Sequence, residues 1–548
     1  MHRAAASLLV LFAAGLSLPG VLHAQGDEAP PPGAGVVRVL VPPVWWRWDQ
    51  RFSQGTAGYA NGQLVPLGVD FGADSLGTAQ LPFLGPSEAA LRAVSGLPTF
   101  SLNIGRADLA LNANVRTEPI GLAVGLSRRL SISVLVPLVR SRVETSFRLD
   151  SSHTNVGWNP AYQLAGAYDG FRRQVDSALA ALRAQAAYGP AGLRAQARAA
   201  LTQYATLLCD LYGVAGGAPS SAASPCSGAT TGTAAPFLPL QSSAPGDSID
   251  TRLAAAQAGY ATLASLYAGA GVALPAFNDS FPLPTAPLTR DDFQRFLTDS
   301  TLGVDGDSLA MALHTRLGDI EVGATYAFAE RRSWHGLVTA TVRLPTGMVD
   351  AQSDFVDVGT GEHQLGIELA TRNDFAIGTG FRVIAAARVG TRFANELWRR
   401  VSPPWLPIAP LSSLALVRRA IGDYLGLDLT PTWRVDDAFS LGVRYAFFRQ
   451  AGTHYTYVDA ADSARVRLPA SVLDEETAVR WMRIGAAVTF STLDRFAAGR
   501  ATLPYTLTVG YQNTFWGRGG LTPQASMMYI TFATYFRLWG SGEKLAAW

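Results

Sequence analysis

The densest group of side chains that could do chemistry lies between residues 344 and 363. Four acids, Asp350, Asp354, Asp357 and Glu362, occur in this stretch beside His363. Oxygen ligands from a single loop suit calcium, but the spacing of an EF-hand is absent. Acidic loops are also commonly just solvated. The sequence therefore predicts a loop here, with no metal site.

Two short motifs flank these acids. "RLPTG" (343–347) lacks the residue that a sortase signal carries between Pro and Thr, and "GTGEH" (359–363) lacks the Lys and the spacing of a phosphate-binding loop. A hydrolase would need a nucleophile, a base and an orienting group within reach. His153, His335 and His454 fall at turns or strand ends, and no Ser lies in a "GxSxG" elbow. We expect neither an enzyme nor a cofactor.

A second candidate set is spread over many segments. Its members share the polar side of alternating stretches: Arg343, Arg382, Arg388, Arg392, Arg434, Arg444, Arg483 and Arg537, with the acids Glu321, Glu368 and Asp428. If these residues line a pore, the excess of arginine would favour anions. The alternative is that the arginines pair with the acids and close the lumen.

Strands must position these residues, because the sequence from 318 onward alternates with a period of two. In "IEVGATYAFAE" (320–330) one face is apolar and the other is small, hydroxylated or charged. A soluble sandwich and a membrane barrel both alternate in this way. The polar face is rich in Gly, Thr and Arg, short and long connections alternate, and aromatic residues gather near strand ends as in interfacial girdles, for example in "YAFF" (445–448), "HYTY" (454–457) and "TYFRLW" (534–539). These features favour the barrel.

The expected fold is all-β, a transmembrane antiparallel up-and-down β-barrel of about 12 strands, within a range of 10 to 14, with a mainly helical insertion. An even number returns both ends of the chain to the periplasmic side. The predicted strands are 63–73, 108–127, 130–149, 318–330, 335–346, 363–373, 375–394, 414–434, 438–458, 477–492, 502–513 and 524–538.

The ends of the chain suggest export. Arg3, an apolar run and a small-residue end predict a signal peptide over residues 1–24, cleaved after Ala24. We expect a periplasmic segment over 25–62, barrel strands over 63–150 and 318–538, and a tail over 539–548. Trp45, Trp46 and Trp48 are too close together for one strand face. They fit an interfacial aromatic cluster slightly better than a segment packed into the lumen.

Residues 151–317 change period and form the insertion, placed by topology outside the cell or in the barrel mouth. Helical spacing predicts helices over 162–187, 193–213 and 249–268, and Thr289 is the N-cap of another over 289–297. Cys209 and Cys226 lie in this region, and an exported compartment favours a disulfide between them. Two cysteines alone cannot form a tetrahedral zinc site.

The overall composition limits the possible partners. Charged residues make up only 16% and aromatic residues 10%, which suits a chain whose solvent is partly lipid. The formal net charge of +2 argues against nucleic acid, which calls for a basic patch or stripe. No apolar stretch is long enough to predict a membrane-spanning helix.

Four segments occur in an informative order: "LSRRLSISVLVPLVRSR" (126–142), "LGDIEVGATYAF" (317–328), "VTATVRLPTG" (338–347) and "VGTGEHQLGIELA" (358–370). Together they resemble the outer-membrane family known as the putative MetA-pathway of phenol degradation, whose members are similar to hydrophobic-solute channels. The chain departs from that family in Arg128-Arg129 and in its insertion. The resemblance implies an outer-membrane channel for passive uptake of small solutes, hydrophobic or aromatic ones among them, with no catalytic residues. The competing hypothesis is a closed barrel that serves as a surface scaffold or adhesion protein. The sequence leaves the oligomeric state open.

Overall fold

The computed structural model describes residues 31–53, 59–69, 72–216, 226, 235–356, 358–403, 406, 408–519 and 522–539. The predicted signal peptide lies outside the described residues, as does the predicted tail beyond Trp539. The chain divides into a barrel unit (1–71, 109–147 and 306–548) and a helical unit (72–108 and 148–305). Within the described residues, no helix is long and apolar enough to cross a membrane.

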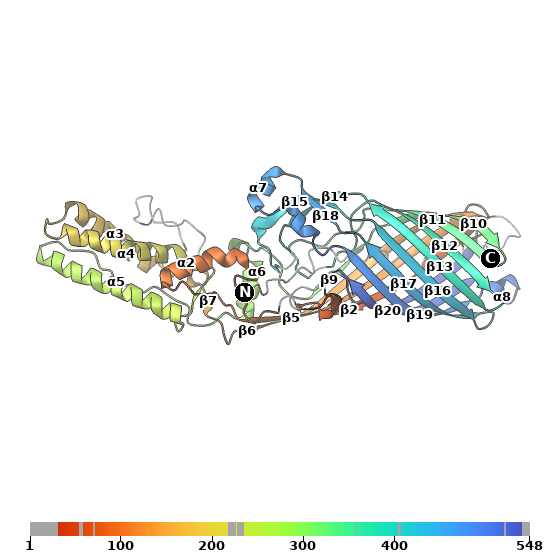
Figure 1. The fold of residues 1–548 in the computed structure, drawn as a ribbon, viewed down its shortest axis with the longest axis horizontal. Helices are drawn as coiled ribbons and strands as arrows, with labels where there is room; N and C mark the ends of the chain where they lie inside the picture. The colour runs from red at the N-terminus through yellow and green to blue at the C-terminus, as the bar shows by residue number, and fades with distance from the viewer. Residues whose placement is uncertain are drawn as a thin grey trace. The chain divides into compact units, whose positions relative to one another are not determined.

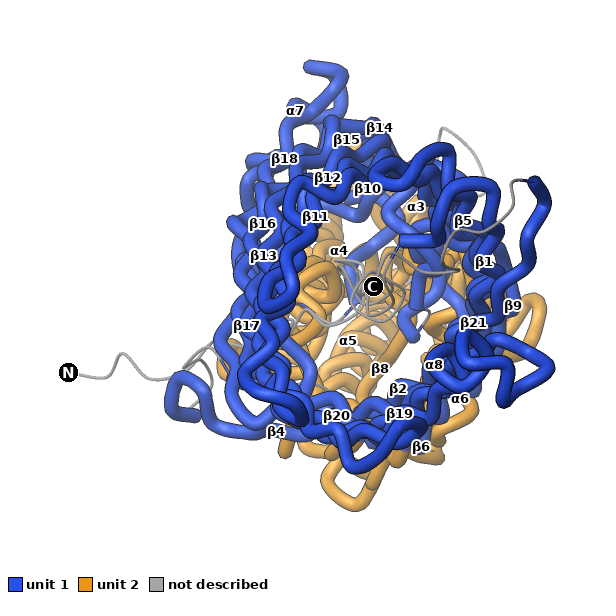
Figure 2. Tube along the Cα trace, turned by 90° about the vertical axis from the view of Figure 1, so that its right-hand side faces the viewer, with its two compact units in different colours: residues 1–71, 109–147, 306–548 blue, residues 72–108, 148–305 orange. Residues whose placement is uncertain are grey.

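The barrel unit is built on one antiparallel sheet of fourteen strands. In two places, a pair of successive strands occupies a single position around the barrel. β1 (Val36–Val41) and β2 (Val44–Trp48) both lie between β5 (Arg106–Gly125) and β21 (Ser526–Arg537). β9 (Ala312–Leu317) and β10 (Glu321–Arg331) both pair with β6 (Leu130–Asp150). Because β5 also pairs with β6, the sheet closes on itself (Figure 2).

The remaining strands complete the circuit, each hydrogen-bonded to its neighbours. They are β11 (Trp334–Arg343), β12 (Gly366–Ile377), β13 (Phe381–Arg392), β16 (Tyr424–Arg434), β17 (Phe439–Gln450), β19 (Val479–Ser491) and β20 (Tyr505–Arg518). The predicted closed antiparallel barrel of twelve strand positions is confirmed.

The first predicted strand, over 63–73, is wrong. Among the described residues of that segment the strand is β4 (Leu64–Pro66), and it pairs with β3 (Gln50–Phe52) in a separate two-stranded sheet. The first barrel position belongs to β1 and β2, inside the segment predicted to be periplasmic. Pro42 and Pro43 separate these two strands and hide them from a search for continuous alternation.

Two other predicted strands are each two separate elements. The segment 414–434 divides into β15 (Leu414–Ala420) and β16, and 438–458 divides into β17 and β18 (His454–Tyr457). β15 and β18 join β14 (Asn395–Arg400) in a three-stranded side sheet. This sheet has its own buried cluster, which includes Val401, Val417 and Tyr455, and the short helix α7 (Ala460–Val466) follows β18 (Figure 1).

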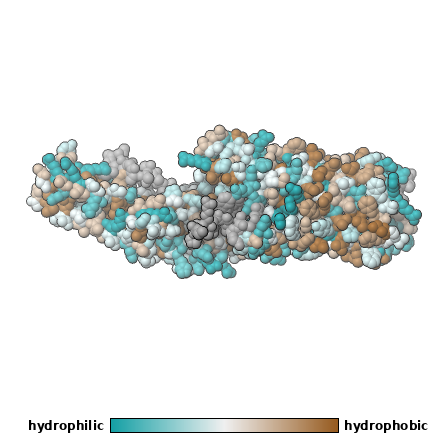
Figure 3. All heavy atoms as spheres, in the orientation of Figure 1, coloured by the Kyte–Doolittle hydropathy of each residue, from teal (hydrophilic) through white to brown (hydrophobic). Residues whose placement is uncertain are grey.

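The outer face of the barrel is apolar. Alternate residues such as Leu425, Leu427 and Leu429 on β16, and Leu441 and Val443 on β17, are exposed. Figure 3 shows hydrophobic side chains gathered over the barrel strands, β13, β16 and β17 among them. Such a surface is costly in water and favourable in lipid, as in outer-membrane barrels.

The helical unit contains α2 (Gly85–Ser95), α3 (Asp169–Tyr188), α4 (Arg194–Val214), α5 (Ala244–Gly269) and α6 (Arg290–Thr298) (Figure 1). The last four match the predicted helices, and Thr289 caps α6 through a capping box with Asp292. α2 was not predicted. β7 (Val156–Trp158) and β8 (Phe237–Pro239) pair within this unit, and a disulfide joins Cys209 to Cys226. The helical unit spans residues 148–305, where the predicted insertion spans 151–317; it also takes in residues 72–108, and β9 belongs to the barrel.

Candidate functional site in the barrel interior

On β17 and β19 the inward-facing residues change in size along the strand. On β17 the inward row runs from Phe448 at the end that precedes the long connection to Ser440 at the short-turn end, through Ala446, Arg444 and Gly442. On β19, the same direction reads Trp481, Arg483, Gly485, Ala487 and Thr489. Large side chains therefore gather at one level of the barrel and small ones at another.

At the level of the large side chains, aromatic rings and guanidinium groups pack against one another. Arg392 lies over the Tyr424 ring at 5.5 Å, the Tyr424 and Phe448 rings are 5.8 Å apart, and the Phe448 and Trp481 rings stack at 5.2 Å with an interplanar angle of 16°. Arg483 lies 3.7 Å from the Trp481 ring and 4.6 Å from the Trp46 ring. We call these six residues, Arg392, Tyr424, Phe448, Trp481, Arg483 and Trp46, the belt.

The belt is supported by buried hydrogen bonds and ion pairs. Arg343 contacts Glu321 through two nitrogens at 2.9 and 3.0 Å, and both side chains are nearly buried. The Tyr424 hydroxyl donates a hydrogen bond to Glu368, and Arg483 donates one to Thr514 at 3.0 Å. Buried charges of this kind are stable only when paired. The two hydrogen bonds anchor Tyr424 and Arg483 of the belt.

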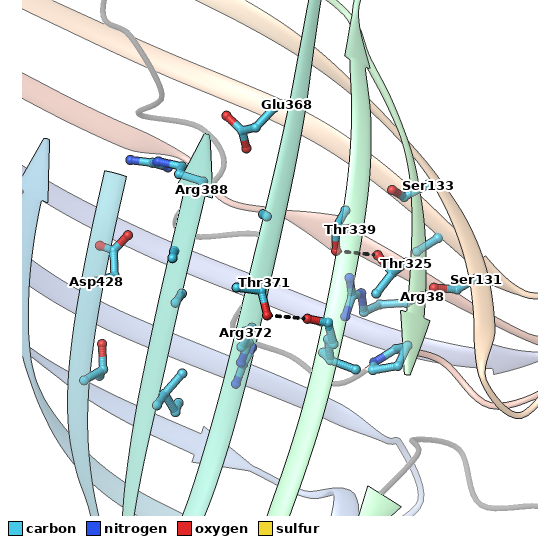
Figure 4. Close-up of a pocket in the computed structure, with 18 of the residues that line it drawn as sticks. Arg38, Ser131, Ser133, Thr325, Thr339, Glu368, Thr371, Arg372, Arg388 and Asp428 are labelled. Carbon is cyan, nitrogen blue, oxygen red and sulfur yellow. Dashed lines mark hydrogen bonds between the residues drawn. The ribbon is translucent and has the colours of Figure 1, made fainter. Parts of the chain in front are cut away.

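Between the belt and the short turns the interior holds two cavities, which together we call the vestibule. The smaller, of about 90 Å³, is lined by Arg38, Arg372, Arg388, Arg444, Glu368 and Asp428 with six Ser and Thr side chains (Figure 4). The larger, of about 270 Å³, reaches Arg434, Asp436 and Asp494 at the short-turn end. Arg372, Ile384, Thr430 and Arg444 line both cavities, so the two cavities are neighbours along the barrel.

The predicted lining residues are distributed over these levels. Arg388, Arg444, Glu368 and Asp428 line the smaller cavity, and Arg382, Arg434 and Arg444 line the larger. Arg392 and Arg483 belong to the belt, and Arg343 and Glu321 support it. Arg537 lies exposed at the end of β21.

Arginine ion pairs occur both beside the belt and in the wall of the smaller cavity. Arg343 pairs with Glu321, and Arg444 pairs with Asp428 at 2.8 Å. These pairs do not close the lumen throughout, because the vestibule remains hollow beneath the belt.

Several lining residues were missed by the sequence reasoning. Arg372 follows the inward parity of Glu368 on β12, so continuing the alternation by four residues would have found it. Arg38 belongs to the overlooked first strand. The inward aromatic residues were missed because aromatics near strand ends were interpreted as interfacial girdles. Phe448 of "YAFF" and Tyr535 of "TYFRLW" are buried, and "HYTY" forms β18 in the side sheet.

The "LPTG" and "GTG" motifs lie close together at the rim of the barrel, where β10, β11 and β12 meet. The Asp319 carboxylate accepts hydrogen bonds from the amides of Gly347 and Glu362, both at 2.8 Å. Thr346 accepts from the Ile320 amide at 2.8 Å and donates to the Gly318 carbonyl at 2.7 Å, and Thr360 donates to the Leu317 carbonyl at 2.9 Å. We call Asp319, Thr346, Gly347, Thr360 and Glu362 the rim knot.

Close packing explains Gly347 of the rim knot and Gly361, which lies beside it. A Cβ on Gly361 would lie 2.7 Å from the Asp319 carboxylate, and one on Gly347 would lie 2.7 Å from the Gly361 backbone. The "LPTG" and "GTG" motifs are therefore structural, since each supplies a hydroxyl and a backbone without a side chain at a crowded junction.

The loop acids each have their own contacts. Asp350 and Arg399 form a bidentate ion pair at 2.6 and 2.7 Å that is almost completely buried, and Glu362 pairs with Arg419 at 3.1 Å. Asp354 lies 3.8 Å from His314, while Asp357 lies outside the described residues. Over the described part of the chain, no three His, Cys, Asp or Glu side chains are grouped to hold a metal.

Comparisons with known proteins give structural matches only: no family model and no curated protein matches the chain. A solved outer-membrane channel from Pseudomonas putida is similar at 9% identity and a TM-score of 0.41, over 93% of this chain and 98% of that one. A FadL homologue from Pseudomonas aeruginosa is similar at 8% identity and a TM-score of 0.27, over 97% and 100%. The toluene transporter TbuX from Ralstonia pickettii is similar at 8% identity and a TM-score of 0.27, over 92% and 90%. Values this low do not place the chain in a family, and the barrel described above rests on its own strand pairings.

Proposed function

We propose that this protein is an outer-membrane channel for passive uptake of small solutes. The observation that carries the proposal is a polar-lined vestibule of two adjacent cavities inside a barrel whose outer face is apolar. An apolar exterior fits lipid, and hydroxyl and charged side chains inside a barrel are the lining of a water-filled path.

The belt is the barrier that a solute would have to pass. Its six residues are side chains from five strands, held to one another mainly by ring stacking and cation–π contacts. Such contacts are individually worth about 0.5 to 2 kcal/mol. Rotation of a few side chains would therefore open a path without any strand leaving the sheet.

The alternative is a closed barrel that acts as a surface scaffold or adhesion protein. A barrel that serves only as a support is expected to fill its interior with side chains, as small barrels do. The inward Gly442 and Ala487 line the larger cavity and leave it hollow instead, which favours the channel.

Connectivity indicates on which side of the membrane the helical unit lies. The unit's two segments connect to the start of β5 and the end of β6, and a short turn joins the other ends of these strands. Short turns are periplasmic in outer-membrane barrels and long connections are extracellular. We infer that the helical unit is extracellular, and that the chain reaches the outer membrane after removal of residues 1–24.

Planar-bilayer recording of the purified full-length protein tests the channel. We expect discrete current steps from the wild type, and a several-fold larger step from the Phe448→Ala/Trp481→Ala variant, since both rings leave the belt. Trp433→Ala is the matched control, because Trp433 is 67% exposed on the outer face and should leave the step size unchanged. If neither the wild type nor the belt variant gives current steps, the result would support the scaffold hypothesis and reject the channel hypothesis.

A further inference from the structure

We propose that the connection between β19 and β20 is an inner gate, which narrows the short-turn end of the vestibule and widens it when released; this inference rests on the proposed channel function. The connection comprises residues 492–504 and includes the short helix α8 (Leu493–Ala497). We call residues 492–504 the arm. Figure 1 shows α8 at the end of the barrel opposite the side sheet of β14, β15 and β18. In the proposed channel, this end faces the periplasm.

The arm folds inward at the first residue of its helix. Leu493 packs against a buried cluster carried by the strands β1 and β21. The cluster consists of Val36, Leu40, Ala533 and Tyr535. Leu40 and Ala533 line the larger cavity, and so does Leu493 itself. The side chain of Leu493 therefore lies inside the mouth of the barrel and not on its lipid-facing side.

Charged contacts hold the arm on its other side. Asp494 lies 2.6 Å from Arg434, the last residue of β16. Arg500 and Arg495 lie 3.2 and 4.0 Å from Asp437, in the turn between β16 and β17. The contacts of the arm thus extend from β16 to the cluster on β21 and β1, with β17, β19 and β20 between them. A turn that continued the line of its own two strands would not reach both sides, so the arm lies across part of the exit.

The base of the arm is fixed to the sheet, whereas side-chain contacts hold its tip at the mouth. The Thr492 amide donates to the Tyr505 carbonyl at 2.9 Å, and the Thr492 hydroxyl donates to the Leu503 carbonyl at 2.7 Å. Towards the tip, the side chains of Arg434 and Asp494 are 43% and 59% exposed. Exposed ion pairs are weak and are screened by salt. The contacts of the tip can therefore break while the base of the arm stays in place.

The lining of the larger cavity indicates what release of the arm would do. Arg434, Asp437, Leu493 and Asp494 all line this cavity, so the contacts that hold the arm are part of the cavity wall. Breaking these contacts would remove one side of the wall and widen the path to the periplasm. The belt lies at the other end of the vestibule and would not change. The belt and the arm would then be two barriers in series, and the effect of the arm is clearest once the belt has been opened.

The test is planar-bilayer recording of the belt variant with and without a second change in the arm. Leu493→Asn/Asp494→Asn removes both the apolar contact and the ion pair, so we expect a several-fold larger current step. The matched control is Ala497→Asn/Ala498→Asn, which adds the same side chains at two exposed positions of the arm and should leave the step size unchanged. The recording uses low-salt potassium chloride, because high salt would itself screen the ion pairs.

Cross-linking tests the same contact in the opposite direction. Arg434→Cys/Asp494→Cys replaces the ion pair with two thiols, which a short reducible bis-thiosulfonate reagent can join. The native Cys209 and Cys226 are already joined in a disulfide and would not compete for the reagent. We expect the cross-linked channel to give the smaller step and reduction of the linker to restore the larger one. A channel with the unmodified arm, treated with the same reagents, should not change.

A labelling experiment keeps the inference testable if the belt variant does not fold. Ala487 lines the larger cavity, so the reaction of Ala487→Cys with a bulky maleimide in detergent reports access through the exit while the belt is intact. Leu493→Asn/Asp494→Asn should speed this reaction several-fold. If neither the step size nor the labelling rate responds to the arm variants, the gate is rejected and the channel remains. Absence of current steps from the wild type and the belt variant would instead reject the channel, and the labelling rate would still decide whether the arm covers the exit.

Discussion

The belt and the vestibule share the strands β13, β16, β17 and β19, and on β17 and β19 they differ in the size of the inward residues. On β17 the row that begins with Phe448 ends with Ser440, and on β19 the row that begins with Trp481 ends with Thr489 and Ser491. Strand alternation decides which side chains face inward. The volume of each inward side chain then decides whether that level of the barrel is filled or hollow.

The mouth of the vestibule also holds its charges differently from the layer beside the belt. Arg343 and Glu321 beside the belt are 11% and 7% exposed, whereas Arg434 and Asp494 at the vestibule mouth are 43% and 59% exposed. A buried pair depends on both partners, because loss of one leaves an uncompensated charge, while an exposed pair is screened by water. The contrast between the levels can therefore be measured as a difference in stability.

The largest expected effect follows from breaking the buried pair. Arg343→Ala should lower the free energy of unfolding by about 3 to 5 kcal/mol, because Glu321 remains buried without its partner. Arg434→Ala should lower it by less than about 1 kcal/mol. Urea titration of both variants, folded in the same detergent micelles, measures the difference. Equal losses would show that the two levels do not differ in the way described.

An intermediate effect is expected at the rim knot, which joins the strands that carry Glu321 and Arg343. Asp319→Asn keeps the size of the side chain but replaces one acceptor oxygen with a donor, so one of the two amide hydrogen bonds is lost. The expected cost is about 2 kcal/mol, as for hydrogen bonds to charged groups. Asp423→Asn, in the connection that precedes β16, is the control in the same titration. An unchanged free energy of unfolding in the Asp319→Asn variant would mean that the motif residues do not stabilise the rim.

The smallest effect is expected among the hydroxyls of the vestibule. Thr489 and Thr508 line the larger cavity, and their hydroxyl oxygens lie 2.8 Å apart. Thr489→Val should cost about 1 kcal/mol, whereas the double variant Thr489→Val/Thr508→Val should cost less than the sum of the two single changes, since no hydroxyl is left without its partner. A double-mutant cycle measures this coupling. Additive losses would show that the two hydroxyls act independently.

Much of the barrel follows from the sequence because lipid imposes a simple rule on its strands. Val322, Tyr326 and Phe328 of β10 alternate with inward residues, and the expected faces agree with the observed exposure. The rule fails where strands leave the sheet. β15 and β16 form one apolar alternation in sequence, yet residues 421–423 between them let β15 turn into the side sheet.

The belt could not be predicted from the same rule. An aromatic residue on an outward position and one on an inward position look alike near a strand end, as Tyr445 and Phe448 do. Which of them contacts lipid depends on strand parity, and the stacking of Arg483 between Trp46 and Trp481 depends on neighbours that are distant in sequence. The rim knot was also hidden, because its parts are separated by strands and become one site only in the folded barrel.

The seam of the barrel has a consequence for the order of folding. Val36 pairs with Arg537 and Val41 with Phe532, so the first strand of the barrel is hydrogen-bonded to the last. The helices of the helical unit can form from local contacts, but this seam must wait until β21 has been delivered to the membrane. Contacts of such long sequence separation are the slowest to form, because most of the chain must be ordered before they can be made. Barrel closure is therefore expected to be the last and slowest step in assembly, and an export chaperone that keeps β1 and β2 unpaired until then would protect the chain from aggregation.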